Sequence, residues 1–328
     1  MSIFIKAPAS TSEFVELVNS FPKREIKYAF HDIDGTHSLI RDWVPVMTLV
    51  TGAVAAYGMF PGTAEAAARA IALHSPDEFP EAREFAIESA GLSALTQMEW
   101  ALRMSRRLNG ESSELNEKII QAIWQGEERF EAFGESAESL AELKNQSSKL
   151  FKVYEILLLE MCRNKNLAAA KAEPAAWQVP GSMDFLQMLY DNNVKNYFVT
   201  GAVVEYDKNN APTGSMAEEV AALGYKIGKN EFIEKFCGST WHTKLPKVEI
   251  MRQLCQTENI RPEELLIVGD GRSEIAAAVE IGAIALSRLD KTAKKQQEIH
   301  RKLGTNLIVS DYKNIQSIFE TGSVPDKG

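Results

Sequence analysis

The chain has 328 residues, of which 45% are hydrophobic and 25% charged, and its formal net charge is −9. These values are typical of a soluble globular protein with one large domain or two medium ones, and the acidic balance, without a basic stripe, argues against a nucleic-acid-binding surface. No apolar run approaches the roughly 20 residues of a membrane span and the first residues lack the order of a secretory signal, so we expect a cytoplasmic protein, without membrane contact, whose partner is a small molecule.

The first half of the chain is expected to be mostly helical. Residues 1–25 suggest a leading arm and a helix, and the run IKYAFH at 26–31 suggests a strand. From about 39 to 177, apolar residues recur at three- and four-residue spacing with little β-branched alternation, which predicts an all-helical block.

Beyond residue 177, short apolar runs alternate with helical patterns. Strands are expected in KNYFVTGA, ELLIVGDG, AIALSR and TNLIVSDY. Strands that recur between helices predict right-handed βαβ units and a parallel sheet covered on both faces. We therefore predict an α/β protein: a Rossmann-like, doubly wound core formed by residues 1–38 and 178–328, with the helical block 39–177 inserted as a second domain.

Polar residues follow three of the expected strands. Asp32 and Asp34 follow the first strand, Thr200 ends NYFVT, and Asp270 ends LLIVGD. Open parallel sheets bind ligands beyond the carboxyl ends of their strands, so these groups are expected to converge there if the strands are neighbours. Three carboxylates at one edge repel one another unless a cation offsets them, and Mg²⁺ is the natural candidate.

Each motif alone has a plainer explanation. DIDGT could be an Asp-Gly turn, while a calcium loop is excluded because Thr36 and Trp43 stand where that loop needs acidic or amide side chains. IVGDG could be a simple strand-to-helix turn, and a threonine at a strand end is common. Their order, spacing and location together are what indicate a site.

These motifs resemble those of the haloacid dehalogenase-like hydrolases. YAFHDIDGT is similar to the family's first motif, NYFVTG to its second, and LLIVGDGRSE to its fourth. The resemblance covers residues 26–36 and 178 to about 312, and the helical block stands where this family inserts its helical cap domains. It therefore implies a cap domain at 39–177.

The resemblance also implies roles for individual residues. Asp32 is expected to attack phosphorus and form an aspartyl-phosphate, and Asp34 to protonate the leaving oxygen and then activate water. Thr200 and a lysine are expected to stabilise the phosphoryl oxygens. The expected Mg²⁺ ligands are Asp32, Asp34 through its backbone carbonyl, Asp270 and Glu274. The expected substrate-binding residues are Thr36, His37, Arg41, Gly201 and Lys244.

The position of the motif-three lysine has two candidates. Lys247 begins the expected helix VEIMRQL and has the spacing before Asp270 that is typical of phosphoserine phosphatases. Lys244 approximates the Lys-Pro form of phosphoglycolate phosphatase relatives, although its proline is displaced to position 246. We favour Lys247 as the catalytic lysine and retain Lys244 as the alternative.

Three positions depart from the family pattern. His31 replaces an apolar residue before the nucleophile, and burial with a hydrogen bond is expected for it rather than a catalytic role. His37 replaces a leucine and, with Arg41 and Trp43, could either face the substrate or pack the hinge of the inserted domain. Glu274 stands where aspartate is commoner, which weakens its assignment as a metal ligand.

The second aspartate, Asp34, separates phosphate chemistry from dehalogenation, because dehalogenases of this superfamily lack it. The leading hypothesis is a Mg²⁺-dependent phosphomonoester hydrolase that acts on a small phosphorylated metabolite. A sugar phosphomutase and a phosphonate hydrolase of the same superfamily are alternatives, as is a catalytically silent binding module. The sequence specifies neither the metabolite nor the oligomeric state.

Overall fold

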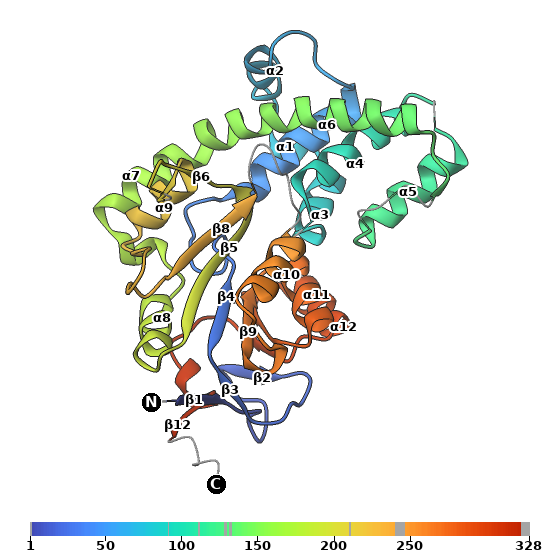
Figure 1. The fold of residues 1–328 in the computed structure, drawn as a ribbon. Helices are drawn as coiled ribbons and strands as arrows, with labels where there is room; N and C mark the ends of the chain where they lie inside the picture. Colours follow the sequence, from blue (N-terminus) through green and yellow to red (C-terminus); the bar gives the residue numbers. More distant parts are fainter. Residues whose placement is uncertain are drawn as a thin grey trace. The chain divides into compact units, whose positions relative to one another are not determined.

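A computed structural model describes residues 2–90, 92–110, 112–127, 130, 133–209, 211–239 and 247–322. The chain forms two compact units: Met1–Ile40 with Leu167–Gly328, here called the α/β unit, and Arg41–Asn166, here called the helical unit. No helix within the described residues is long and apolar enough to cross a membrane. Figure 1 traces the chain through both units.

The α/β unit is built on a seven-stranded sheet, counted over the described residues, in the order β2-β11-β10-β9-β4-β5-β8. Its strands pair in parallel, except that β2 runs antiparallel to β11. The prediction of an α/β, Rossmann-like parallel core is therefore confirmed. The strands are β2 (Val15–Leu17), β4 (Tyr28–His31), β5 (Lys195–Val203), β8 (Lys235–Ser239), β9 (Leu265–Gly269), β10 (Ile284–Arg288) and β11 (Leu307–Val309).

A second, antiparallel sheet corrects the expectation for residues 1–25, which do not form an arm and a helix. β1 (Ser2–Ile5) pairs with β3 (Arg24–Ile26) and with β12 (Phe319–Gly322). The alternation in SIFI buries Ile3 and Ile5. The prediction failed because β12, at the far end of the chain, provides one of the partners, and such pairing leaves no local signal.

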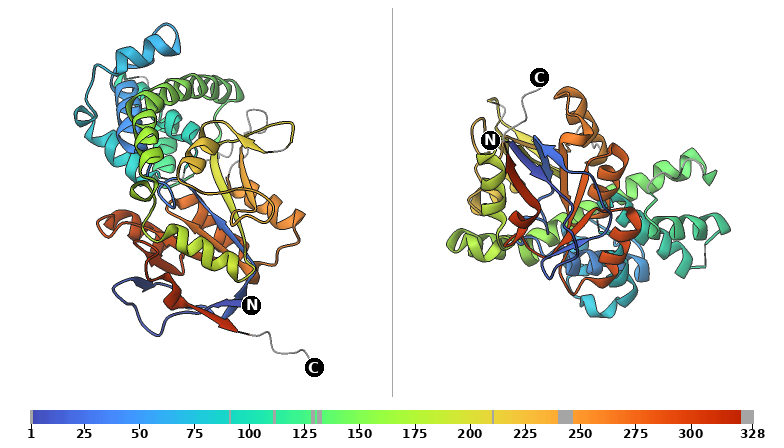
Figure 2. Two further views of the ribbon diagram at one scale, coloured as in Figure 1. Left: turned by 90° about the vertical axis from the view of Figure 1, so that its left-hand side faces the viewer. Right: turned by 90° about the horizontal axis from the view of Figure 1, so that it is seen from below.

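Helices cover both faces of the seven-stranded sheet, as Figure 2 shows from two sides. Alternate residues of the strands point to opposite faces: Phe30 packs in the cluster with residues of α10 and α11, whereas Ala29 packs in the cluster with Phe185 of α8. The helices are α8 (Ser182–Asp191), α9 (Ser215–Ala222), α10 (Lys247–Thr257), α11 (Arg272–Ile281) and α12 (Lys294–Leu303). A short hairpin of β6 (Glu205–Tyr206) and β7 (Pro212–Thr213) follows β5, and 3₁₀ turns occupy Pro174–Trp177, Pro262–Glu264 and Ile315–Ile318.

The helical unit has its own hydrophobic core. Every residue from Val46 to Ala55 of α1 is buried, so α1 is the central helix. Phe85 of α3 stacks on Trp100 of α4 with ring centroids 3.9 Å apart. The elements are α1 (Trp43–Tyr57), α2 (Ala64–Ile71), the 3₁₀ turn Pro76–Glu78, α3 (Pro80–Glu88), α4 (Ala94–Leu108), α5 (Glu114–Trp124) and α6 (Ala137–Leu158).

The helical unit ends earlier than the helical sequence pattern. After α6, the π-helical turn Leu159–Arg163 continues into α7 (Asn164–Ala172). Leu167 and Ala170 of α7 pack in the same cluster as Ile33 and Ile40, so the α/β unit resumes at residue 167 rather than at 178. Periodicity reports that a helix continues but not which core it contacts.

Candidate active site

The three motif strands are neighbours in the sheet. β4 lies between β5 and β9, with His31 in register with Phe198 and Val268. Asp32, Thr200 and Asp270 therefore meet at the carboxyl edge, where open parallel sheets bind ligands. One detail differs from expectation: Thr200 does not end its strand, because β5 continues to Val203 through an irregularity in its pairing with β8.

The loop after Asp32 is a tight turn. The Ile33 carbonyl accepts hydrogen bonds from the backbone N–H groups of His37 and Ser38, both at 2.8 Å. Gly35 has φ of 72°, in the left-handed region that favours glycine. A Cβ at this position would lie 1.9 Å from Asp270 Oδ2. Glycine thus allows both the turn and the close approach of the Asp270 carboxylate to the loop.

A single ammonium group joins two of the buried carboxylates. Lys247 Nζ donates to Asp32 Oδ1 at 2.6 Å and also to Glu274 Oε1. Asp32 is 5% exposed and Glu274 is 1% exposed. The third carboxylate, that of Asp270, is linked to Asp32 through Thr36. The Thr36 hydroxyl is 3.5 Å from Asp32 Oδ2 and 3.4 Å from Asp270 Oδ1. These last contacts are at the long limit of hydrogen bonding, so the hydroxyl satisfies neither oxygen well.

The pKa shifts of the two aspartates indicate an excess of negative charge at this site. Burial, and then the nearby charges of Asp32 and Glu274, raise the pKa of Asp270 well above its usual range. Burial also raises the pKa of Asp32, although Lys247 opposes that shift. Desolvation would lower the pKa of Lys247, but the two carboxylates it contacts raise it. Such shifted groups clustered at the end of a sheet are typical of functional sites.

The carboxylate oxygens of the site suit a hard divalent cation, although Lys247 is hydrogen-bonded to the Asp32 carboxylate. Among the described residues, no group of three or more His, Cys, Asp or Glu side chains is arranged to hold a metal ion. Lys247 engages Asp32 instead. However, Asp32 and Asp270 present only oxygen atoms, and their raised pKa values indicate that added positive charge would be stabilising. Oxygen ligands of this kind suit Mg²⁺.

Thr200 and Gly201 border the lysine. Thr200 is buried, and its hydroxyl accepts a hydrogen bond from the Ala202 N–H at 3.1 Å. Gly201 is exposed, and a Cβ placed there would lie 3.7 Å from Lys247 Cε. The Thr200–Gly201 backbone and the Lys247 side chain therefore face the same space.

His31 and His37 lie inside the protein, and neither is exposed at all. The expectation that His31 is buried with a hydrogen bond is confirmed, because its Nε2 lies 3.2 Å from Asn196 Oδ1. For His37, the structure favours packing over substrate contact. Both of its ring nitrogens are hydrogen-bonded, to Ser182 Oγ at 2.6 Å and to His31 Nδ1 at 3.0 Å.

The remaining predicted residues belong to different parts of the chain. Asp34 is half-buried in the loop, and its backbone bridges to Ser38. Arg41 belongs to the helical unit, where its charge acts on the Glu155 carboxyl group. Lys244 lies outside the described residues.

Sequence reasoning missed two residues that hold the Asp32 loop. Arg288, the last residue of β10, donates to the Gly35 carbonyl at 3.0 Å. Tyr312, which follows β11, donates to the Thr36 carbonyl at 3.0 Å. The available signal was position, because Arg288 ends one strand of the sheet and Tyr312 follows another. The Lys247–Glu274 contact was also missed, since Glu274 was expected to face a metal.

Solved structures support the fold. A predicted phosphatase from Clostridium acetobutylicum superposes with a TM-score of 0.50 and 13% identity, over 89% of this chain and 97% of that one. A proposed phosphoglycolate phosphatase from Lactobacillus delbrueckii subsp. bulgaricus gives a TM-score of 0.50 and 15% identity, over 90% and 99% of the two chains. No sequence-family profile matches the chain, and no curated protein is similar to it in sequence.

At these identities, the structural similarity establishes the fold alone. The chain therefore shares its fold with two proteins described as phosphatases, which agrees with the resemblance inferred from the motifs at the level of the fold.

Proposed function

We propose that the chain is a Mg²⁺-dependent phosphomonoester hydrolase that acts on a small phosphorylated metabolite through an aspartyl-phosphate on Asp32. The observation that carries this proposal is the buried Asp32–Lys247 pair, with Nζ and Oδ1 2.6 Å apart, beside Asp270 at the carboxyl edge of the sheet. A nucleophilic carboxylate next to a cation is what displacement at a phosphoryl group requires.

The proposed reaction has two displacements. In the first, an Asp32 carboxylate oxygen bonds to phosphorus, the ester P–O bond breaks, and Asp34 gives its proton to the leaving alkoxide. In the second, Asp34 takes a proton from water, the water oxygen bonds to phosphorus, and the acyl-phosphate bond breaks to release phosphate and restore Asp32. One acid two residues from the nucleophile can serve both half-reactions.

Other residues of the site would hold the phosphoryl group. The Lys247 ammonium group and the Thr200 hydroxyl would contact its oxygen atoms beside Gly201, as stabilisation of charge on these atoms requires. Asp32, Asp270 and the Asp34 backbone carbonyl would hold Mg²⁺. The ion, when bound, would offset the charge of the carboxylates and of the phosphate. Glu274 would then act mainly by orienting Lys247.

We assign substrate selection to the helical unit, as in an inserted cap. The strand ends of the α/β unit carry the proposed chemical groups, and a separate domain would supply contacts to the leaving group and exclude water from the reaction. If Arg41 binds the anionic substrate, Arg41→Ala should raise KM for that substrate more than for p-nitrophenyl phosphate. Equal effects on both substrates would return Arg41 to a packing role.

The test is phosphate release from a panel of phosphorylated metabolites, with Mg²⁺ and with chelator. We expect at least one monoester to be hydrolysed only with Mg²⁺, with inhibition by fluoroberyllate, a phosphoryl mimic, under the same condition. Asp32→Asn is the matched control because it keeps the shape and removes the nucleophile. Hydrolysis by that variant at the wild-type rate would end the proposal, and phosphate transfer without release would indicate a mutase.

A further inference from the structure

Two buried histidines flank the loop that carries the proposed nucleophile and acid. His31 is the last residue of β4, and His37 directly follows Thr36. Their rings meet behind the loop, where His37 Nε2 lies 3.0 Å from His31 Nδ1. This hydrogen bond joins the two ends of the Asp32–Thr36 loop by a contact between side chains. It thus adds to the backbone hydrogen bonds that form the turn.

Complete burial disfavours the charged form of both rings, and neighbouring polar groups then set their proton positions. The Asn196 amide NH₂ donates to the carbonyls of Leu186 and Phe232, at 3.1 and 3.0 Å, so its Oδ1 must accept from His31 Nε2. A neutral His31 then has a bare Nδ1, which accepts from the Nε2–H of His37.

The hydrogen-bond chain continues on the other side of His37. Its bare Nδ1 then accepts from the Ser182 hydroxyl at 2.6 Å. The Tyr225 hydroxyl lies 2.6 Å from Ser182 Oγ and 3.1 Å from the His37 carbonyl oxygen, and its proton is shared between these two acceptors. The Tyr312 ring stacks on the His37 imidazole with centroids 5.3 Å apart, while its hydroxyl donates to the Thr36 carbonyl. Every ring nitrogen of the two histidines therefore has a partner, and neither ring has a group to offer a substrate.

We propose that His31 and His37 form a clamp, a hydrogen-bonded pair of neutral rings each protonated on Nε2, that positions the Asp32–Thr36 loop for phosphoryl transfer. In this role they are positioning residues, because they act through the loop and touch no reacting atom. The role of the clamp in phosphoryl transfer rests on the proposed function. Residues that orient groups which contact the substrate or metal typically change activity about 10- to 100-fold when replaced.

Substitution of His37 can remove its hydrogen bond to His31 while keeping the one to Ser182. In His37→Gln the longer amide can place its NH₂ near the position of Nε2 and keep the bond to His31. In His37→Asn the shorter amide can reach Ser182 but not His31. We expect His37→Asn to lower kcat about 10- to 100-fold with KM within about twofold, and His37→Gln to stay within about threefold of wild type.

Thr305→Val is the matched control for the loss of a buried hydrogen bond. Its hydroxyl is fully buried and lies 2.8 Å from Ser287 Oγ, outside the clamp. We expect this variant to lose stability without losing kcat. If both His37 variants lose kcat equally and in proportion to their unfolding free energies, the residue is only structural and the clamp is overturned.

A second measurement does not depend on activity or on variants that fold. In wild-type protein labelled with ¹⁵N-histidine, the ring nitrogen shifts of His31 and His37 at pH 7 should both report the neutral tautomer protonated on Nε2. A tautomer protonated on Nδ1, or averaging between tautomers, at either ring would overturn the clamp. Absence of hydrolysis by the wild type would instead overturn the proposed function and leave this readout intact.

Discussion

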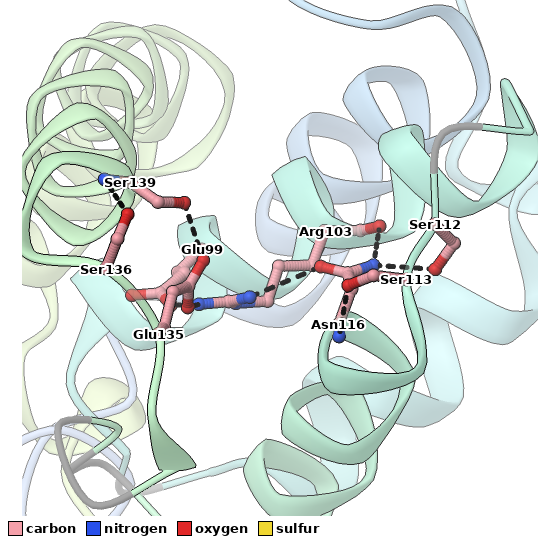
Figure 3. A network of polar contacts seen from close by, with 8 residues as sticks. All are labelled: Glu99, Arg103, Ser112, Ser113, Asn116, Glu135, Ser136 and Ser139. Carbon is pink, nitrogen blue, oxygen red and sulfur yellow. Dashed lines mark hydrogen bonds and ion pairs between the residues drawn. The ribbon is translucent and has the colours of Figure 1, made fainter.

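In each unit, the described residues include a cluster in which a buried cation contacts carboxylates, and the two clusters differ in how completely their charges are matched. In the helical unit, Arg103 donates through Nε to Glu99 at 2.8 Å and through Nη2 to Glu135 at 2.5 Å. Its Nη1 donates to Asn116 Oδ1 at 3.2 Å, and the Ser139 hydroxyl supports Glu135 at 2.6 Å. Figure 3 shows these side chains linked to one another between the helices.

The Lys247 cluster in the α/β unit is incomplete by comparison. One ammonium group faces Asp32 and Glu274, and the third carboxylate, Asp270, has a pKa raised by burial and by its acidic neighbours. Among the described residues, Glu274 Oε2 is buried without a hydrogen-bond partner.

The two clusters differ in charge balance and in the hydrogen-bond donors that their cations offer. A planar guanidinium with five donors can satisfy several acceptors in fixed directions, which suits a network that connects helices. If the proposed function holds, an ammonium group among excess carboxylates would leave negative charge for a cation and hydrogen-bond donors for a phosphate. Groups held for a ligand cost stability in its absence, so the two clusters should respond to substitution in opposite ways.

Removal of the arginine should give the largest change in stability. Arg103→Met leaves Glu99 and Glu135 in a buried place without their cation, and breaking a buried pair in this way costs about 3–5 kcal/mol. Hydrogen exchange of peptides from α4, α5 and α6 should report that loss. Arg107→Met, on the same helix but 46% exposed, should change the same free energy by less than about 0.5 kcal/mol. Similar effects of the two variants would remove the distinction between the clusters.

Asp270→Asn should separate activity from stability in the α/β unit. Loss of a proposed metal ligand should lower the hydrolysis rate about 100- to 1,000-fold. In chelator the same variant should be more stable to urea than wild type by about 1 kcal/mol, because one of three repelling carboxylates is gone. The control is Glu298→Gln on the surface of α12. A stability loss for Asp270→Asn as large as that of Arg103→Met would mean that Asp270 is structural.

Substitution of the two glutamates that contact Arg103 should change the free energy of unfolding by less than Arg103→Met does, and by different amounts. Burial would raise the pKa of Glu135, but hydrogen bonds from Arg103 and Ser139 outweigh it and lower that pKa. Burial raises the pKa of Glu99 in spite of Arg103. Glu135→Gln should therefore cost about 1–2 kcal/mol at pH 7, and Glu99→Gln clearly less.

The pH dependence gives the sign of this difference. A carboxyl group whose folded pKa is lowered contributes stability above its unfolded pKa and loses it as the pH falls through the folded pKa. The cost of Glu135→Gln should therefore shrink on acidification, which urea titrations of the variant and wild type at several pH values would measure. A cost that grows toward low pH would contradict the assigned direction.

The sequence predicted the parallel core because its strands are apolar runs between amphipathic helices. It missed β8, whose residues KFCGS include a lysine and two small residues and pair with β5 only through the tertiary fold. It also missed β1 and β3, which pair with each other, and β1 has its second partner, β12, at the far end of the chain.

For the site too, the sequence predicted some contacts and missed others. Asp32 and Asp270 could be brought together from the sequence because each follows a strand, and strand ends share an edge. The Lys247–Glu274 pair and the His31–His37 contact could not, since they depend on which way helix and loop side chains turn. Neither direction is encoded by spacing alone.

The most direct test of the account asks where the phosphoryl group goes. Turnover of a hydrolysed monoester in the presence of Mg²⁺ should be quenched in acid, and the protein digested and examined by peptide mass spectrometry. One phosphoryl group is expected on Asp32, and none in Asp32→Asn or in samples with chelator. A phosphoryl group on another residue, or hydrolysis that proceeds through Asp32→Asn at the wild-type rate, would contradict it.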